Sequence, residues 1–125
     1  MKYKKTDFNY LFDSVKKASD LANQNHPDGK VDIRNVALKV MEESGELAAE
    51  VLKLIGHKVT KESKAKILKN LKSEGVDTFL ATLDVLNLAG VSKEEILALS
   101  DKAIEKWKQK HIKPKARARQ RQNNK

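Results

Sequence analysis

The stretch "MEESGELAAEV", residues 41–51, places four glutamates among the apolar residues of a predicted helix. Like charges on neighbouring turns of a helix repel one another and weaken it slightly. The segment therefore needs either solvent around its carboxylates or a cation between them. Which of the two applies depends on where the apolar residues and the other acidic residues of the chain fall.

Apolar residues recur at helical spacing in four segments, which predicts an all-α fold. These segments are residues 8–22, 32–56, 63–88 and 92–113. Asp32 is the expected N-cap of the second helix, and Ser92 with Glu95 forms a capping box at the start of the fourth. Pro114 is expected to end that helix. The predicted architecture is a four-helix bundle-like chain.

The formal net charge of +9 lies entirely in the last twenty residues. Residues 1–105 contain 17 basic and 17 acidic side chains, whereas residues 106–125 contain nine basic side chains and no acidic one. The high pI therefore carries no information about a binding face on the globular part. We divide the chain into an all-α domain, residues 1–110, and a basic tail, residues 111–125, that is expected to be disordered.

Several classes of protein are disfavoured by composition. The chain contains no cysteine, which excludes disulfides and thiolate metal sites. No apolar run approaches the length of a membrane span, and the lysine-containing start lacks the apolar region of a signal peptide. A cytoplasmic protein without membrane contact is the resulting expectation.

Two acidic pairs flank the apolar stripes of the second and third helices. Glu43 and Glu46 are three residues apart on one helix, and Glu74 and Asp77 have the same spacing on the next. If the helices pack antiparallel, the pairs face each other, and repulsion among four carboxylates favours a divalent cation. An all-oxygen ligand set without histidine suits Mg²⁺, or Mn²⁺, better than zinc or a di-iron centre.

An ordinary interpretation of the same residues stays open. A glutamate-rich helix is usually a solvated surface, and Lys39 and Lys53 stand at helical spacing as partners.

The third predicted helix suggests association between chains, because from Val76 to Leu88 it is apolar on nearly all sides. We therefore expect a homodimer or a dimer of dimers with this helix at the shared core.

The sequences "EESGELA" at residues 42–48 and "EGVD" at residues 74–77 resemble the EExxE…ExxD pattern of the MazG-like, all-α nucleoside triphosphate pyrophosphohydrolases. The resemblance covers roughly residues 32–110 and includes Lys102 and Lys106 in the last helix. It implies hydrolysis of a nucleoside or deoxynucleoside triphosphate to the monophosphate and pyrophosphate, in nucleotide housecleaning or regulation.

The resemblance also implies roles for individual residues. The Mg²⁺ ligands would be Glu43, Glu46, Glu74 and Asp77. Glu42 would be an outer, catalytic carboxylate that orients water. Lys102 and Lys106 would contact phosphate oxygens of the substrate, and Asn87 would contact the base.

The alternative function is a helical nucleic-acid-binding or protein-interaction module that acts through its basic tail. Arg117, Arg119 and Arg121 alternate with small or amide residues, which suits contact with phosphates without base readout. This tail would add weak nucleic-acid binding to the domain and would leave the acidic pairs unaffected.

Overall fold

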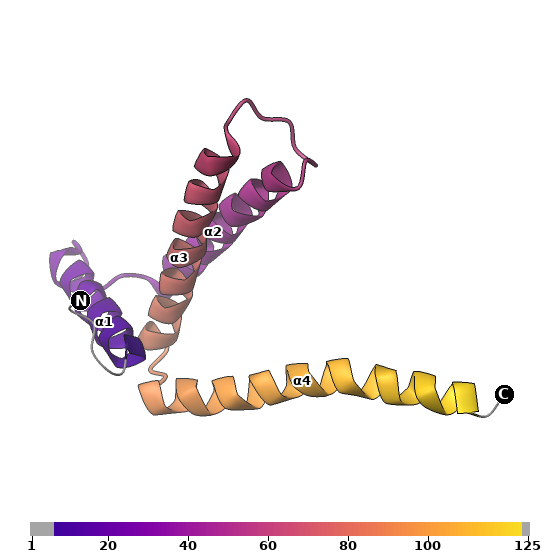
Figure 1. Ribbon diagram of the computed structural model, residues 1–125. Helices are drawn as coiled ribbons and strands as arrows, with labels where there is room; N and C mark the ends of the chain where they lie inside the picture. The colour runs from indigo at the N-terminus through magenta and orange to yellow at the C-terminus, as the bar shows by residue number, and fades with distance from the viewer. Residues whose placement is uncertain (1–6, 124–125) are drawn as a thin grey trace. The chain divides into compact units, whose positions relative to one another are not determined.

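A computed structural model of the chain contains four α-helices (Figure 1). It describes the backbone of residues 7–123 and the side chains of residues 8–112. The helices are α1 (Asp7–Asn25), α2 (Ile33–Leu54), α3 (Lys64–Leu88) and α4 (Lys93–Asn123). The described residues contain no strand, and the predicted all-α class is confirmed. The first three helices form one unit that ends at Gly90, and α4 forms a second unit.

The ends of the helices follow local sequence signals. Asp32 and Ser63 cap α2 and α3, because their side-chain oxygens accept backbone N–H groups two and three residues later, at 2.9 and 3.2 Å. In the predicted capping box, Ser92 Oγ accepts the N–H of Glu95 at 3.1 Å. Gly56 follows α2 with a φ of 80°, a conformation that glycine adopts without steric cost.

In the first unit, α2 and α3 lie side by side as an antiparallel hairpin, and α1 contacts α3 (Figure 1). Among the described residues, the buried apolar side chains are Phe12 of α1 and Ile67 and Leu83 of α3. Near the middle of the hairpin, a Cβ placed on Gly75 would lie 3.8 Å from Leu47 Cδ1. The two helices are therefore in contact where the acidic pairs occur in the sequence.

The apolar stripe of α2 is covered over only part of its length. Leu47 is half-buried, whereas Leu38 is 61% exposed and Met41 is 71% exposed. On α3, Val76 and Phe79 are 55% and 48% exposed. Each of these four residues keeps about half or more of its surface exposed, so the described part of the first unit displays apolar surface on both helices of the hairpin.

Helix α4 continues through Pro114 to Asn123, so the predicted end of this helix before Pro114 is wrong. The sequence after the proline, KARARQRQ, consists of residues with high helix propensity, which favours continuation beyond the missing hydrogen bond. The predicted disorder of residues 111–125 is not shown. The expected phosphate contacts of this tail involve side chains outside the described residues.

None of the described helices has the length and apolar character that crossing a bilayer requires.

Candidate metal centre

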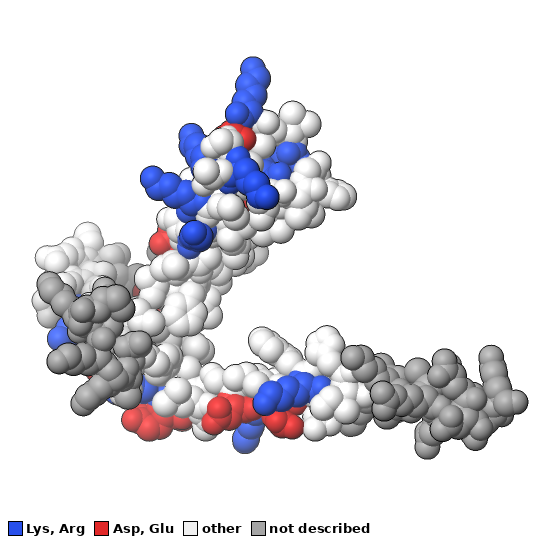
Figure 2. Space-filling model, in the orientation of Figure 1, with Lys and Arg blue, Asp and Glu red and all other residues white. Residues whose placement is uncertain are grey.

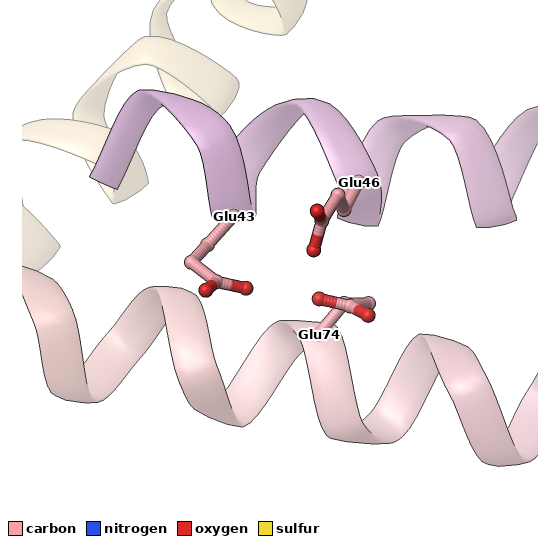
Figure 3. A group of neighbouring side chains, drawn as sticks. All are labelled: Glu43, Glu46 and Glu74. Carbon is pink, nitrogen blue, oxygen red and sulfur yellow. The ribbon is translucent and has the colours of Figure 1, made fainter. Parts of the chain in front are cut away.

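Three glutamates converge between α2 and α3 (Figure 3). Glu43 and Glu46 project from adjacent turns of α2, and Glu74 projects toward them from α3. Each offers a carboxylate oxygen, and these oxygens all lie within 4.8 Å of one another. The hairpin thus brings together three of the four ligands predicted from the sequence.

The three carboxylates differ in their access to water. Glu43 is 6% exposed, Glu74 is half-buried, and Glu46 is exposed. Glu74 Oε2 is enclosed and has no hydrogen-bond partner among the described residues. An enclosed carboxylate oxygen without a partner is unfavourable, because it gives up its hydration and receives no hydrogen bond in return. The group therefore favours a bound proton or a bound cation and is open on the side of Glu46.

The proton affinities of the two buried members move in opposite directions. Burial raises the pKa of Glu74 to about 7, and hydrogen bonding to and repulsion from Glu46 and Glu43 act in the same direction. The pKa of Glu43 is lowered, chiefly because Lys39 donates a hydrogen bond to its carboxylate. Near neutral pH, Glu74 therefore exchanges a proton while Glu43 stays ionised.

Lys39 lies close to the three glutamates, although the sequence argument for a bound cation did not count it among them. Its Nζ lies 2.7 Å from Glu43 Oε1 and 3.6 Å from Glu42 Oε1. The lysine side chain is 53% exposed, so solvent weakens both ion pairs. A single exposed ammonium group cannot neutralise three carboxylates, and the enclosed oxygen of Glu74 is left without a positively charged partner among the described side chains.

The remaining predicted site residues lie outside this group. Asp77 and Glu42 are exposed, and Asn87 is half-buried in the last turn of α3. Lys102 and Lys106 are exposed on α4, in the second unit. Asp77 follows Glu74 by three residues, and its side chain is exposed and does not join the group.

The oxygen atoms of the three glutamates suit a hard divalent cation. Octahedral Mg²⁺ binds oxygen at about 2.0–2.1 Å, so its adjacent ligands lie about 3 Å apart and its opposite ligands about 4 Å apart. The group, with oxygens up to 4.8 Å apart, needs only a small closing movement of side chains to match this geometry. Its exposed side leaves room for water to complete the coordination of a bound ion.

A second polar cluster lies on the same seam, nearer the turn between the helices. Lys53 Nζ donates to Glu50 Oε1 at 2.9 Å and to Glu62 Oε1 at 2.7 Å. Asn70 Nδ2 donates to the other oxygen of Glu62 at 3.2 Å. The Glu50–Lys53 pair has the i,i+3 spacing of a helical ion pair. Glu62 lies in a loop, so helical spacing could not predict its contact with Lys53.

No family model, curated protein or solved structure matches the chain. The resemblance to the MazG-like enzymes therefore rests on the acidic motifs and their spacing.

Proposed function

We propose that the chain is a Mg²⁺-dependent nucleoside triphosphate pyrophosphohydrolase of the MazG-like type. The substrate is a nucleoside or deoxynucleoside triphosphate, and the products are the monophosphate and pyrophosphate. The observation that supports this proposal best is the convergence of Glu43, Glu46 and Glu74 from two helices around an enclosed, unpartnered oxygen. We place the activity in the cytoplasm, in housecleaning or regulation of the nucleotide pool.

In this proposal the three glutamates hold Mg²⁺, for which Mn²⁺ can substitute. The cation neutralises charge on the triphosphate and makes a bound water more acidic. Glu43 is buried on α2, so its carboxylate would be a well-positioned ligand for the ion. Glu42, exposed one residue earlier, accepts the proton of the attacking water. Asp77 is a fourth carboxylate that approaches from the solvent side after a rotamer change.

Two further roles are proposed from the resemblance. Lys102 and Lys106 are four residues apart on α4, so their ammonium groups lie on one face and suit contact with phosphate oxygens. Asn87, in the last turn of α3, contacts the base of the nucleotide.

Association of the chain with a second copy is part of the proposal. Leu38, Met41, Val76 and Phe79 form exposed apolar surface on the hairpin that carries the glutamates. Burying such side chains against an equivalent surface contributes roughly 25 cal/mol for each Å² of apolar area. We propose a homodimer or a dimer of dimers, which light scattering coupled to size exclusion will detect and Phe79→Glu will weaken.

The decisive experiment measures pyrophosphate release from the common ribo- and deoxyribonucleoside triphosphates, with Mg²⁺, with Mn²⁺ and with a chelator. Glu43→Gln preserves shape but removes a charged ligand, and we expect it to reduce turnover by more than the about 10- to 100-fold typical of outer-sphere partners. Glu50→Gln is the matched control, because it makes the same change on the same helix outside the metal centre.

We expect Glu50→Gln to retain most of the turnover at a temperature where both variants are folded. Absence of turnover with every triphosphate and both metals would contradict the proposal. Equal reductions in the two variants would assign the effect to the fold of α2 and would contradict the role given to Glu43.

A further inference from the structure

The turn between α2 and α3 and the start of α3 carry a dense positive charge. Residues 57–72, HKVTKESKAKILKNLK, which we call the basic tip, contain six lysines and one glutamate. All six lysines are exposed or partly exposed at the surface: Lys58, Lys61, Lys64, Lys66, Lys69 and Lys72. Figure 2 shows Lys and Arg atoms gathered over this end of the hairpin. The overall charge balance of residues 1–105 conceals this local excess.

The single acidic residue of the basic tip does not offset this charge at the surface. Glu62 is turned toward the seam, where Lys53 and Asn70 donate hydrogen bonds to its carboxylate and leave 25% of its side chain exposed. Of the six lysines, Lys66 comes within 3.8 Å of Glu62. The other five have no acidic partner among the described residues, so their charge is available to a ligand.

The start of α3 also reverses the usual distribution of charge along a helix. Its first turn contains no acidic residue and carries Lys64 and Lys66. The N-terminal end of a helix bears a partial positive charge from its free N–H groups, so lysines there are unfavourable in the isolated chain. An anionic partner would offset the repulsion between these lysines and the helix N-terminus, and it would also accept hydrogen bonds from the free N–H groups.

The basic tip and the metal centre occupy different faces of α3. Lys72 precedes Glu74 by two residues and is therefore turned by about 200° around the helix. Lys69 lies one turn before Lys72 and on the same outer side. A ligand on these lysines would not contact the three glutamates, so the basic tip is separate from the proposed active site.

We propose that the basic tip binds the phosphodiester backbone of a nucleic acid. The lysines from Lys64 to Lys72 extend over about 12 Å of helix, and Lys64, Lys69 and Lys72 lie within about 140° of one another around its axis, which suits successive phosphates of a backbone passing along that side. Residues 57–72 contain no arginine, so bidentate guanine recognition by arginine is not available, and the imidazole of His57 is the single aromatic ring in the tip on which a base could stack. The contact is therefore one of charge and shape, without base selectivity.

An anionic membrane fits the same lysines less well. Val59 is 100% exposed at the end of the hairpin, and Ile55, at the end of α2, is 59% exposed. If Val59 entered a bilayer end-on, Lys72 would be held farther from the lipid headgroups than the screening length of about 8–10 Å at physiological salt. A nucleic acid lying along α3 can engage Lys64, Lys69 and Lys72 together.

The test measures binding of the full chain to short fluorescein-labelled duplexes, one of DNA and one of RNA, by fluorescence anisotropy at several salt concentrations. The tip variant carries Lys64→Gln, Lys69→Gln and Lys72→Gln. The matched control, with the same net charge, carries Lys16→Gln, Lys17→Gln and Lys30→Gln, three exposed lysines away from the tip. A third variant carries Arg117→Gln, Arg119→Gln and Arg121→Gln in the tail.

We expect the tip variant to bind about tenfold or more weakly and to reduce the slope of log K against log salt by about three, one for each phosphate that no longer faces a lysine. The matched control should bind nearly as the parent does. The tip variant should keep its helical circular dichroism and its pyrophosphate release, so failure of the hydrolase proposal remains a separate result.

Any of four outcomes would overturn the proposal. One is no binding of either duplex by the parent chain at low salt. Another is an equal decrease of affinity in the tip variant and the matched control, or a decrease confined to the tail variant. The last is tip-dependent cosedimentation with vesicles containing phosphatidylserine when binding to both duplexes is unaffected by the tip substitutions, which would identify a membrane as the partner.

Discussion

The seam between α2 and α3 holds two groups of acidic side chains, and they differ in how their charge is balanced. Near the turn, Lys53 lies between Glu50 and Glu62, and its side chain is only 17% exposed. In the middle of the hairpin lie Glu43, Glu46 and Glu74. Of these three, Glu43 alone forms an ion pair with the exposed Lys39. Glutamates along one seam therefore form a closed cluster, Glu50 and Glu62 with Lys53, and an open cluster, Glu43, Glu46 and Glu74.

The proton affinities express this difference. Lys53 lowers the pKa of Glu62 by donating a hydrogen bond to it, whereas burial beside two other carboxylates raises the pKa of Glu74 to about 7. A lysine supplied by the chain completes the cluster near the turn. The cluster in the middle lacks such a group, which is the condition expected of a site that takes its cation from solution.

The largest effect on stability should come from removing the lysine of the closed cluster. Lys53→Met leaves two poorly solvated carboxylates without their shared cation, and breaking a buried ion pair in this way is strongly destabilising. We expect the melting temperature, measured by calorimetry, to fall on the order of 10 °C.

Lys39→Met makes the same substitution at the open cluster and is the matched control. We expect a small change in melting temperature, because exposed ion pairs contribute little. Mg²⁺ should bind this variant more tightly than the parent in isothermal titration, because a competing positive charge has been removed from Glu43. A large destabilisation by Lys39→Met together with weaker Mg²⁺ binding would contradict this. It would show that Lys39 neutralises Glu43, Glu46 and Glu74 as Lys53 neutralises Glu50 and Glu62.

A second, smaller effect should distinguish the clusters by its sign. Glutamine resembles a protonated glutamate, so Glu74→Gln should raise the melting temperature of the metal-free chain at pH 8, where the parent carries an ionised and poorly solvated Glu74. Glu50→Gln should lower the melting temperature, because it removes a charged partner of Lys53. Thermal melts with chelator and with Mg²⁺ measure both effects.

The dependence on pH follows from the same carboxylate. The folded chain holds the Glu74 proton up to a pH of about 7, whereas the ordinary pKa is 4.5. Between these values the native state binds more protons than the unfolded state, so stability without metal falls as pH rises from about 5 to 8. Mg²⁺ should restore it at pH 8, and Glu74→Gln should abolish both effects. A melting temperature that rises steadily over this range would contradict the shift assigned to Glu74.

Local signals in the sequence were sufficient to predict the helices. The caps at Asp32, Ser63 and Ser92 and the breaks at Gly56 and Gly90 fix helix ends through hydrogen bonds and backbone conformation within a few residues. The end predicted at Pro114 was wrong, because the cost of a proline competes with the helix propensity of the residues that follow it.

The metal centre was predictable only in part, because it depends on how two helices approach each other. Spacing identified Glu43, Glu46 and Glu74 and named Lys39 as a helical partner, but it could not show that Asp77 faces solvent. Likewise, counting charges along residues 1–105 could not show that Glu62 turns inward and leaves the neighbouring lysines uncompensated. These features depend on side-chain direction at the seam.

The smallest expected effect on stability comes from two glycines, one beside the open cluster and one near the closed cluster. Gly75 lies within α3 beside Glu74, and a Cβ there would make an ordinary contact with Leu47 at 3.8 Å. Gly75→Ala should therefore raise the free energy of unfolding by about 0.5–1 kcal/mol, because alanine gives up less backbone freedom in a helix. Gly56, near the closed cluster, has a φ of 80°, and Gly56→Ala should lower the free energy of unfolding because alanine is strained there.

Chemical denaturation of the two alanine variants measures both changes, and their opposite signs separate a helical glycine from a turn glycine. A Gly75→Ala chain that is less stable than the parent would mean that the added methyl group does not fit against Leu47. The helices would then approach each other more closely beside the metal centre than the 3.8 Å contact indicates, and the three carboxylates would need less movement to enclose an ion.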